Sequence, residues 1–133
     1  MITGFEDYTR ELTSYENEEL LPIIVRGMKK KIGAENAVKN GTAIASLKKK
    51  GYKISDARFR KLMHIIRVSG MVEGIVATSK GYYIAQTEDE WSSYLKSIKE
   101  RIEHIQALES ALHRQHETWR KLNPPPEPFF KVI

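Results

Sequence analysis

The alternation of apolar and polar residues predicts a first helix over residues 17–31. Its apolar face contains Leu20, Leu21, Ile24 and Met28. Acidic residues occupy the first turn and lysines the last, which suits the helix dipole. Pro22 lies close enough to the expected start to be tolerated there. Residues 1–15 show no clean period, so we expect them to form a docked arm or a short helix.

Two further helices follow in the pattern. The shorter one begins at Thr42, keeps its apolar positions inward and ends near Gly51, a residue typical of a helix C-terminus. The longer one has Ser55 as its N-cap and ends at Gly70. The inner positions of the two helices are Ile44, Ala45 and Leu47, and then Phe59, Leu62, Met63 and Ile66. Between the first two helices, residues 32–41 form a connector with room for one helical turn.

After Gly70 the period changes to that of a strand. The segments "IVATS" and "YYIA" are rich in β-branched and aromatic residues and flank a turn at Lys80-Gly81, which predicts a β-hairpin. Neighbouring residues on a strand point to opposite faces, so either Tyr82 or Tyr83 must face inward. An isolated two-stranded hairpin is marginal in water, so we expect this one to pack against the preceding helices.

A long helix is predicted from Thr87 to Leu122, opening with a capping box between Thr87 and Glu90 and ending before a run of prolines. Apolar residues along it follow the alternating spacing of a coiled-coil seam. We predict that the dimerisation seam consists of Trp91, Leu95, Ile98, Ile102, Ile105, Leu108, Leu112 and Trp119.

Beyond Ile105 the seam changes its register, because the regular continuation falls on Glu109 and His116 whereas a shifted one falls on Leu108, Gln115 and Leu122. This change resembles a stammer in the heptad repeat. The helix has one of two arrangements: it pairs with a second copy, or it breaks near Glu109 and folds back on its own domain.

These elements predict a mainly α-helical protein with one small β-hairpin and a long C-terminal, coiled-coil-like helix. The expected organisation is an N-terminal arm (1–15), a helical domain with the hairpin (16–86), a dimerisation helix (87–122) and a proline-rich tail (123–133). No segment has the length and apolarity of a transmembrane helix, and the N-terminus lacks a signal-peptide pattern. Together with the absence of cysteine, this favours a soluble cytoplasmic protein.

Charge is segregated along the chain. Residues 26–85 contain 14 Lys and Arg against three acidic residues, a net of +11, whereas the remainder has 8 against 14, a net of −6, within the total of +5. Such a basic segment is typical of a surface that binds a polyanion.

The order of three helices and a hairpin resembles a winged helix-turn-helix. Residues 42–85, "TAIASLKKKGYKISDARFRKLMHIIRVSGMVEGIVATSKGYYIA", are similar to the short winged-helix modules of phage and mobile-element proteins. The resemblance implies binding to double-stranded DNA, with the third helix in the major groove and the hairpin tip near the phosphates. The lysine-rich connector after the first helix departs from the family pattern.

The residues themselves place positive charge on that same side of the molecule. Arg58, Lys61 and His64 are our candidates for contact with base edges, and Lys80 at the hairpin tip is a candidate for phosphate contact. The full predicted DNA-binding set is Lys48, Lys49, Lys50, Lys53, Ser55, Ala57, Arg58, Arg60, Lys61, His64 and Lys80. Lysine runs are more often solvated helix ends, and only their combination with a basic third helix favours DNA.

No pattern of catalysis is visible. The chain has no cysteine nucleophile, Gly-rich phosphate loop or Ser-His-Asp arrangement, and His113 and His116 alone are too few ligands for a metal. We therefore predict a non-enzymatic protein without cofactor or metal. The alternatives to DNA binding are RNA binding by the same basic face and a protein-interaction adaptor that docks through the long helix or through the tail with Phe129 and Phe130.

Overall fold

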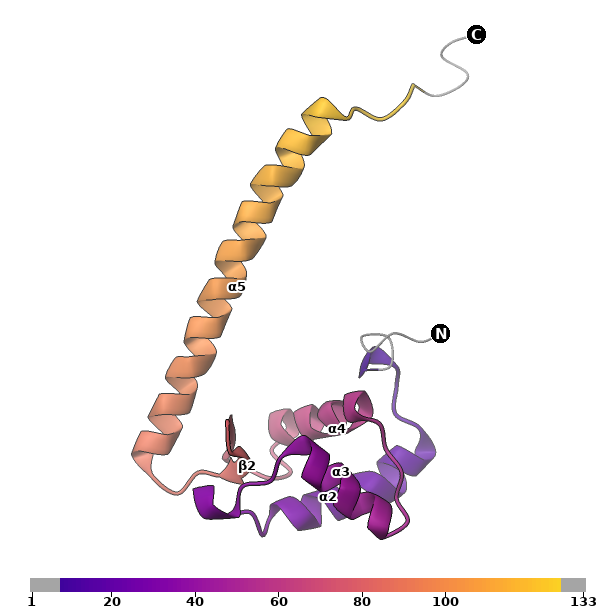
Figure 1. Cartoon of the computed structure of the whole chain (residues 1–133), viewed down its shortest axis with the longest axis vertical. Helices are drawn as coiled ribbons and strands as arrows, with labels where there is room; N and C mark the ends of the chain where they lie inside the picture. Colours follow the sequence, from indigo (N-terminus) through magenta and orange to yellow (C-terminus); the bar gives the residue numbers. More distant parts are fainter. Residues whose placement is uncertain (1–7, 128–133) are drawn as a thin grey trace. The chain divides into compact units, whose positions relative to one another are not determined.

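The structure is a computed structural model in which residues 8–127 are described. It is mainly helical, with one two-stranded antiparallel sheet and a long C-terminal helix (Figure 1). The chain divides into two compact units, Met1–Tyr94 and Leu95–Ile133. Within residues 8–127, none of the helices has both the length and the apolar character needed to cross a membrane.

The first helical segment starts earlier than predicted. It consists of a π-helical turn, η1 (Glu16–Leu20), that continues into α2 (Leu21–Met28). Thr13 and Glu16 form a capping box, because the Thr13 hydroxyl accepts from the Glu16 amide at 3.1 Å and the Glu16 carboxylate accepts from the Thr13 amide at 2.9 Å. Pro22 therefore follows a formed turn, and the wide turn before it, where the Leu21 amide donates to the Glu16 carbonyl, makes room for the proline ring.

Helices α3 (Asn40–Lys49) and α4 (Asp56–Ser69) have the predicted order, although α3 begins two residues before Thr42. The Ser55 hydroxyl caps α4 by accepting from the Arg58 amide at 3.2 Å. Gly70 ends α4 with a φ of 79°, a left-handed conformation that favours glycine. Both predicted ends of α4 are thus confirmed.

The hairpin is formed by β1 (Ile75–Thr78) and β2 (Gly81–Ile84) in antiparallel register. Its support comes from the connector as well as from the helices. The Ile84 amide donates to the Lys31 carbonyl at 2.7 Å, and Tyr82 and Val38 exchange backbone hydrogen bonds of 2.8 and 2.9 Å. Between these two bridges the connector forms one 3-10 turn, η2 (Ala34–Asn36), so the second edge of β2 is largely paired.

One hydrophobic core joins η1, α2, α3, α4 and the hairpin. Its most deeply buried side chains are Leu20, Phe59, Leu62, Met63 and Ile66, and Val76 of β1 is equally buried outside this cluster. Tyr82 is half-buried and packs against this core, which confirms that one of the two tyrosines faces inward, and Tyr83, on the opposite face of the strand, is also buried.

Helix α5 (Glu88–Leu122) is continuous over 35 residues (Figure 1). Its predicted capping box is present: the Glu90 amide donates to the Thr87 hydroxyl and the Thr87 amide to the Glu90 carboxylate, both at 3.1 Å. The suggestion that the helix breaks near Glu109 is wrong, because no glycine or proline interrupts the segment and Glu109 continues the helix.

Candidate nucleic-acid interface

The outward side of α4 presents fewer basic groups than predicted. Arg60 and His64 are exposed, and Ala57 is half-buried. The Arg60 guanidinium lies 3.0 Å from the Asp56 carboxylate, with both side chains more than half exposed. Exposed ion pairs of this kind contribute little to folding stability and their partners separate easily. Arg60 therefore remains accessible to an anion.

Arg67 lies at the C-terminal end of the same helix, and its side chain contacts two tyrosines of the unit. Its guanidinium lies 5.7 Å from the ring centre of Tyr82 and 5.5 Å from that of Tyr94. It also donates a hydrogen bond of 2.6 Å to the Tyr94 hydroxyl. Arg67 therefore attaches α4 to strand β2 and to the first turns of α5 through cation–π contacts and a hydrogen bond.

Lysines surround the start of α4. A shallow pocket at this point is lined by Ile44, Lys48, Lys53, Ile54 and Ser55. The predicted lysines Lys48, Lys49, Lys50 and Lys53 are all exposed, and none is paired with a carboxylate among residues 8–127. The positive end of the α4 dipole lies at the same place, so this corner of the unit is suited to an anion.

The hairpin tip adds one more exposed cation, Lys80, whose backbone amide donates to the Thr78 hydroxyl at 3.2 Å. Gly81 follows it with a φ of 115°, as the predicted turn requires. A Cβ at position 81 would lie 2.4 Å from the Val38 carbonyl oxygen. The turn is therefore held against the connector, which limits the positions that Lys80 can reach.

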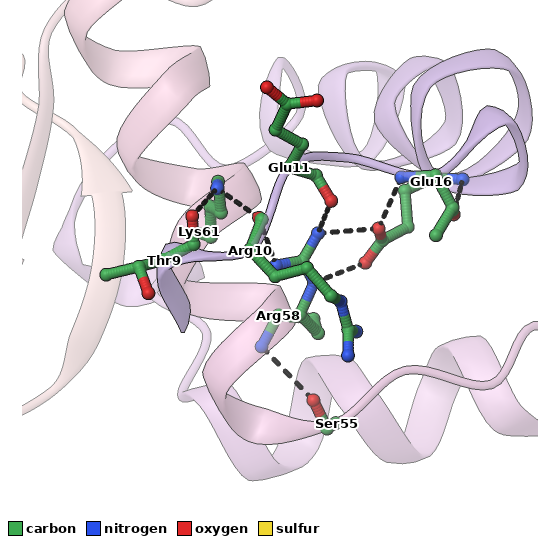
Figure 2. Close-up of polar contacts among 8 residues, drawn as sticks. Thr9, Arg10, Glu11, Glu16, Ser55, Arg58 and Lys61 are labelled. Carbon is green, nitrogen blue, oxygen red and sulfur yellow. Dashed lines mark hydrogen bonds and ion pairs between the residues drawn. The ribbon is translucent and has the colours of Figure 1, made fainter. Parts of the chain in front are cut away.

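Arg58 is the clearest correction to the predicted interface. It is 3% exposed and lies inside the unit, not on the outward face of α4 (Figure 2). Its guanidinium donates to both oxygens of Glu16, at 2.7 and 2.8 Å, and to the carbonyls of Arg10 and Glu11, at 2.6 and 2.8 Å. Arg58 precedes Phe59 by one residue and Leu62 by four, so its side chain leaves the helix at the edge of the buried face.

The contact with Arg58 lowers the pKa of the Glu16 carboxylate. The hydrogen bonds from Arg58 are the largest of the causes that hold the pKa of Glu16 at about 2, well below its ordinary value. The Thr13 amide and hydroxyl act in the same direction, whereas burial opposes them. Glu16 is therefore ionised at neutral pH and serves both the helix cap and the buried ion pair.

Lys61 is half-buried and is also engaged by the N-terminal arm. Its ammonium group donates to the carbonyl of Thr9 at 3.1 Å and to that of Arg10 (Figure 2). Arg58 and Lys61 thus hold the successive carbonyls of residues 9–11 against α4, whereas residues 1–7 of the predicted arm lie outside the described residues. Of the three residues expected to contact base edges, Arg58 is unavailable, Lys61 is occupied in part, and His64 is exposed.

The start of the first helix at Thr13 and Glu16 has a sequence signal that the prediction of a start at residue 17 overlooks. "TSYE" at residues 13–16 is the Ser/Thr-x-x-Glu pattern of a capping box and marks the true helix start. The partnership of Glu16 with Arg58 has no such signal, since the two residues are 42 positions apart. It depends on how the first segment packs on α4.

Most apolar side chains of the predicted seam are exposed on α5. Trp91, Leu95, Ile102, Ile105, Leu108, Leu112, Trp119 and Leu122 are each at least 43% exposed, whereas Ile98 is half-buried. Trp91 belongs to the first unit, and the edge of its ring would lie 3.0 Å from a Cβ at Gly74. His116 stacks on Trp119 with ring centres 6.3 Å apart. Phe129 and Phe130 of the tail lie outside the described residues.

Residues 8–127 contain no group of three or more histidine, cysteine or acidic side chains that could hold a metal ion. No protein-family model, no curated protein and no solved structure matches this chain.

Proposed function

We propose that this protein binds double-stranded DNA as a winged-helix dimer, in the manner of a phage or mobile-element regulator or a replication or packaging accessory factor. The observation that supports this most is the group of exposed lysines around the pocket at the start of α4, which have no carboxylate partner among residues 8–127, with Lys80 at the hairpin tip of the same unit. In a winged helix these are the places that meet the phosphate backbone.

The bridges between the connector and β2 also support the winged-helix assignment. A two-stranded hairpin is marginal by itself in water, and the bridges from Ile32 to Ile84 and from Val38 to Tyr82 give this hairpin a further partner. The connector, which departs from the family pattern in sequence, is therefore compatible with the fold.

The burial of Arg58 changes the kind of recognition that we propose. With Arg58 inside the unit, the exposed α4 residues available for base edges are Arg60 and His64, while most free cations are lysines, which act mainly on phosphates. We therefore propose binding dominated by backbone contacts, with modest sequence preference.

Salt dependence tests this proposal. Labelled duplex DNA is titrated with the full chain at 50 and 200 mM salt, where contact with about five phosphates predicts a loss of affinity of at least 100-fold. The double variant Lys48→Ala/Lys53→Ala should bind more weakly and lower the slope of log K against log salt by about 2.

The control is Lys29→Ala/Lys30→Ala, which removes the same charge from the end of the first helix, outside the proposed interface. If both double variants lose affinity equally, net charge and not this surface determines binding. If the unaltered protein gives no shift at micromolar concentration and 50 mM salt, the proposal is wrong. Stronger competition by structured or single-stranded RNA than by duplex DNA would favour the RNA alternative.

A second candidate function is a protein-interaction adaptor. The exposed apolar residues of α5 favour it, since contiguous apolar surface marks interaction sites. A monomer in sedimentation that binds no nucleic acid would support the adaptor, whereas a dimer with DNA affinity supports the regulator.

A further inference from the structure

We propose that α5 pairs with α5 of a second copy in antiparallel orientation, with the two-fold axis passing at the level of Ile105. This inference rests on the dimer in the proposed function and specifies its geometry. The exposed apolar side chains of α5 are the surface that would be buried.

The exposure of this surface requires a partner. Leu95 is 60% exposed, Ile105 66% and Leu108 59%, although burial of such side chains away from water is favourable. Because α5 does not break, its second half cannot turn back along its first half. A helix about 50 Å long with a continuous seam is typical of a coiled coil with another chain.

The spacing of the seam identifies a second copy as that chain. Counted outward from Ile105, the seam has the same steps in both directions. Three residues away lie Ile102 and Leu108, seven away Ile98 and Leu112, ten away Leu95 and Gln115, and fourteen away Trp91 and Trp119.

An antiparallel two-fold pair uses this mirror symmetry directly. A residue placed before the axis on one helix is level with the residue placed equally far after it on the other. The register change at Ile105 therefore falls on the axis, where Ile105 meets its own counterpart. Each first-half apolar residue then has a seam residue of the second copy level with it.

Charge distinguishes the antiparallel from the parallel arrangement. The first turn of α5 contains Glu88, Asp89 and Glu90, and its last turn contains Arg120 and Lys121. An antiparallel pair brings the acidic end of each helix beside the basic end of the other and also opposes their dipoles. A parallel pair would place six carboxylates together at one end and four cations at the other.

A second charge contact lies nearer the axis. Lys99 follows Ile98 by one residue and Glu109 follows Leu108 by one, so both flank the seam. In the antiparallel register centred on Ile105, Lys99 lies within two residues of the level of Glu109 in the second copy. Two such pairs form by symmetry, and they explain why the residue beside the shifted seam is acidic.

Disulfide trapping tests the orientation, because the chain contains no cysteine of its own. Three full-length single variants are made: Ile98→Cys, Ile105→Cys and Leu112→Cys. Seam positions that face each other come within disulfide range. We expect Ile105→Cys to cross-link with itself, and Ile98→Cys to cross-link with Leu112→Cys when the two are mixed, at least tenfold more than either does alone.

The outcomes separate the alternatives. Efficient self-cross-linking of Ile98→Cys and of Leu112→Cys would show a parallel pair and overturn the proposal. Absence of any cross-link, together with a monomer in sedimentation of the unaltered protein, would overturn the pairing altogether. DNA binding is measured separately on the unaltered chain, so failure of the orientation is distinguishable from failure of the proposed function.

A label on the exposed face keeps the test independent of seam substitutions. Lys96→Cys lies nine residues before the axis and is exposed, so a spin label there leaves the seam intact. In the antiparallel pair the two labelled backbones are separated by about 27 Å along the helix, for 18 residues at about 1.5 Å each. In a parallel pair they are level, so a short label-to-label distance would contradict the proposal.

Discussion

At the residue scale, Glu16 and Arg58 form an ion pair from which solvent is excluded, with side chains only 7% and 4% exposed. A buried charge is tolerated only when it has an opposite charge and partners for its remaining hydrogen bonds. Here the carbonyls of Arg10 and Glu11 accept hydrogen bonds from the Arg58 guanidinium. The pair thus joins three segments: the arm, the first helix and α4.

Replacement of Glu16 by glutamine should be strongly destabilising. Glutamine keeps the shape and can still serve the capping box, but it leaves Arg58 without its counter-charge. The lowering of the Glu16 pKa from 4.5 to about 2 corresponds to about 3 kcal/mol of unfolding free energy at pH 7. We expect urea denaturation of Glu16→Gln to show a loss of this order.

Glu19→Gln is the matched control, because Glu19 is exposed on the same helical turn and its replacement should change the unfolding free energy by less than about 0.5 kcal/mol. The pH dependence gives a further check. Since the folded-state pKa of Glu16 lies below its unfolded value, its stabilisation is complete above about pH 4.5 and is lost as the pH falls towards 2. The difference between Glu16→Gln and the unaltered protein should therefore shrink in that window; an unchanged difference would contradict this origin.

At the element scale, the hairpin depends on a segment that comes before two helices in the chain. The backbone bonds of Tyr82 and Ile84 to the connector give β2 partners on both sides, which an isolated hairpin would lack. The close approach of the connector also determines which residue fits at position 81.

Gly81→Ala should disrupt this contact. The alanine Cβ would lie 2.4 Å from the Val38 carbonyl oxygen, and the φ of 115° is strained for any residue with a side chain. We expect the unfolding free energy to fall by about 2 to 4 kcal/mol. Amide hydrogen exchange should also show loss of protection at Tyr82 and Val38.

Gly27→Ala is the corresponding control, because Gly27 lies within α2 with no atom near the position of a new Cβ. There the substitution should raise the unfolding free energy by about 0.5 to 1 kcal/mol through helix propensity. Equal changes in the unfolding free energy at positions 27 and 81 would show that the contact with Val38 does not determine the effect at position 81.

At the scale of the whole molecule, the two units differ in what they bury. The first unit closes a core around Phe59, Leu62 and Ile66, whereas α5 leaves most of its seam in solvent. The first unit therefore has the means to fold on its own core, and α5 needs association.

Leu112→Glu tests this division of roles. A carboxylate in the seam should shift the dimer towards monomer in sedimentation, because burial of an unpaired charge is unfavourable. Loss of the dimer should also reduce DNA affinity by at least tenfold, since two linked sites bind with avidity. The thermal unfolding of the first unit, followed by circular dichroism, should have nearly the same midpoint as in the unaltered protein.

Ser110→Glu introduces the same charge at an exposed position of α5 outside the seam and should leave both the dimer and the DNA affinity intact. A dimer that survives Leu112→Glu would place the interface elsewhere. Equal dissociation by both substitutions would point to net charge as the cause.

Local information accounts for what could be predicted from the sequence by itself. Ser55, Gly70 and the pair Thr87 and Glu90 act on backbone groups a few residues away, so the ends of α4 and the start of α5 follow from sequence spacing. The apolar period likewise predicted the helices and the hairpin, but it left open whether α5 breaks near Glu109, and the structure shows the helix to be continuous there.

Only the tertiary structure decided which side of α4 each charge occupies and what pairs with β2. Arg58 lies on the border between two helix faces, where a rotation of a few tens of degrees exchanges burial for exposure, and Glu16 and the arm meet it from more than forty residues away. The bridges from Ile32 to Ile84 and from Val38 to Tyr82 likewise join residues 52 and 44 positions apart. Such contacts depend on how elements pack, and no short-range pattern encodes them.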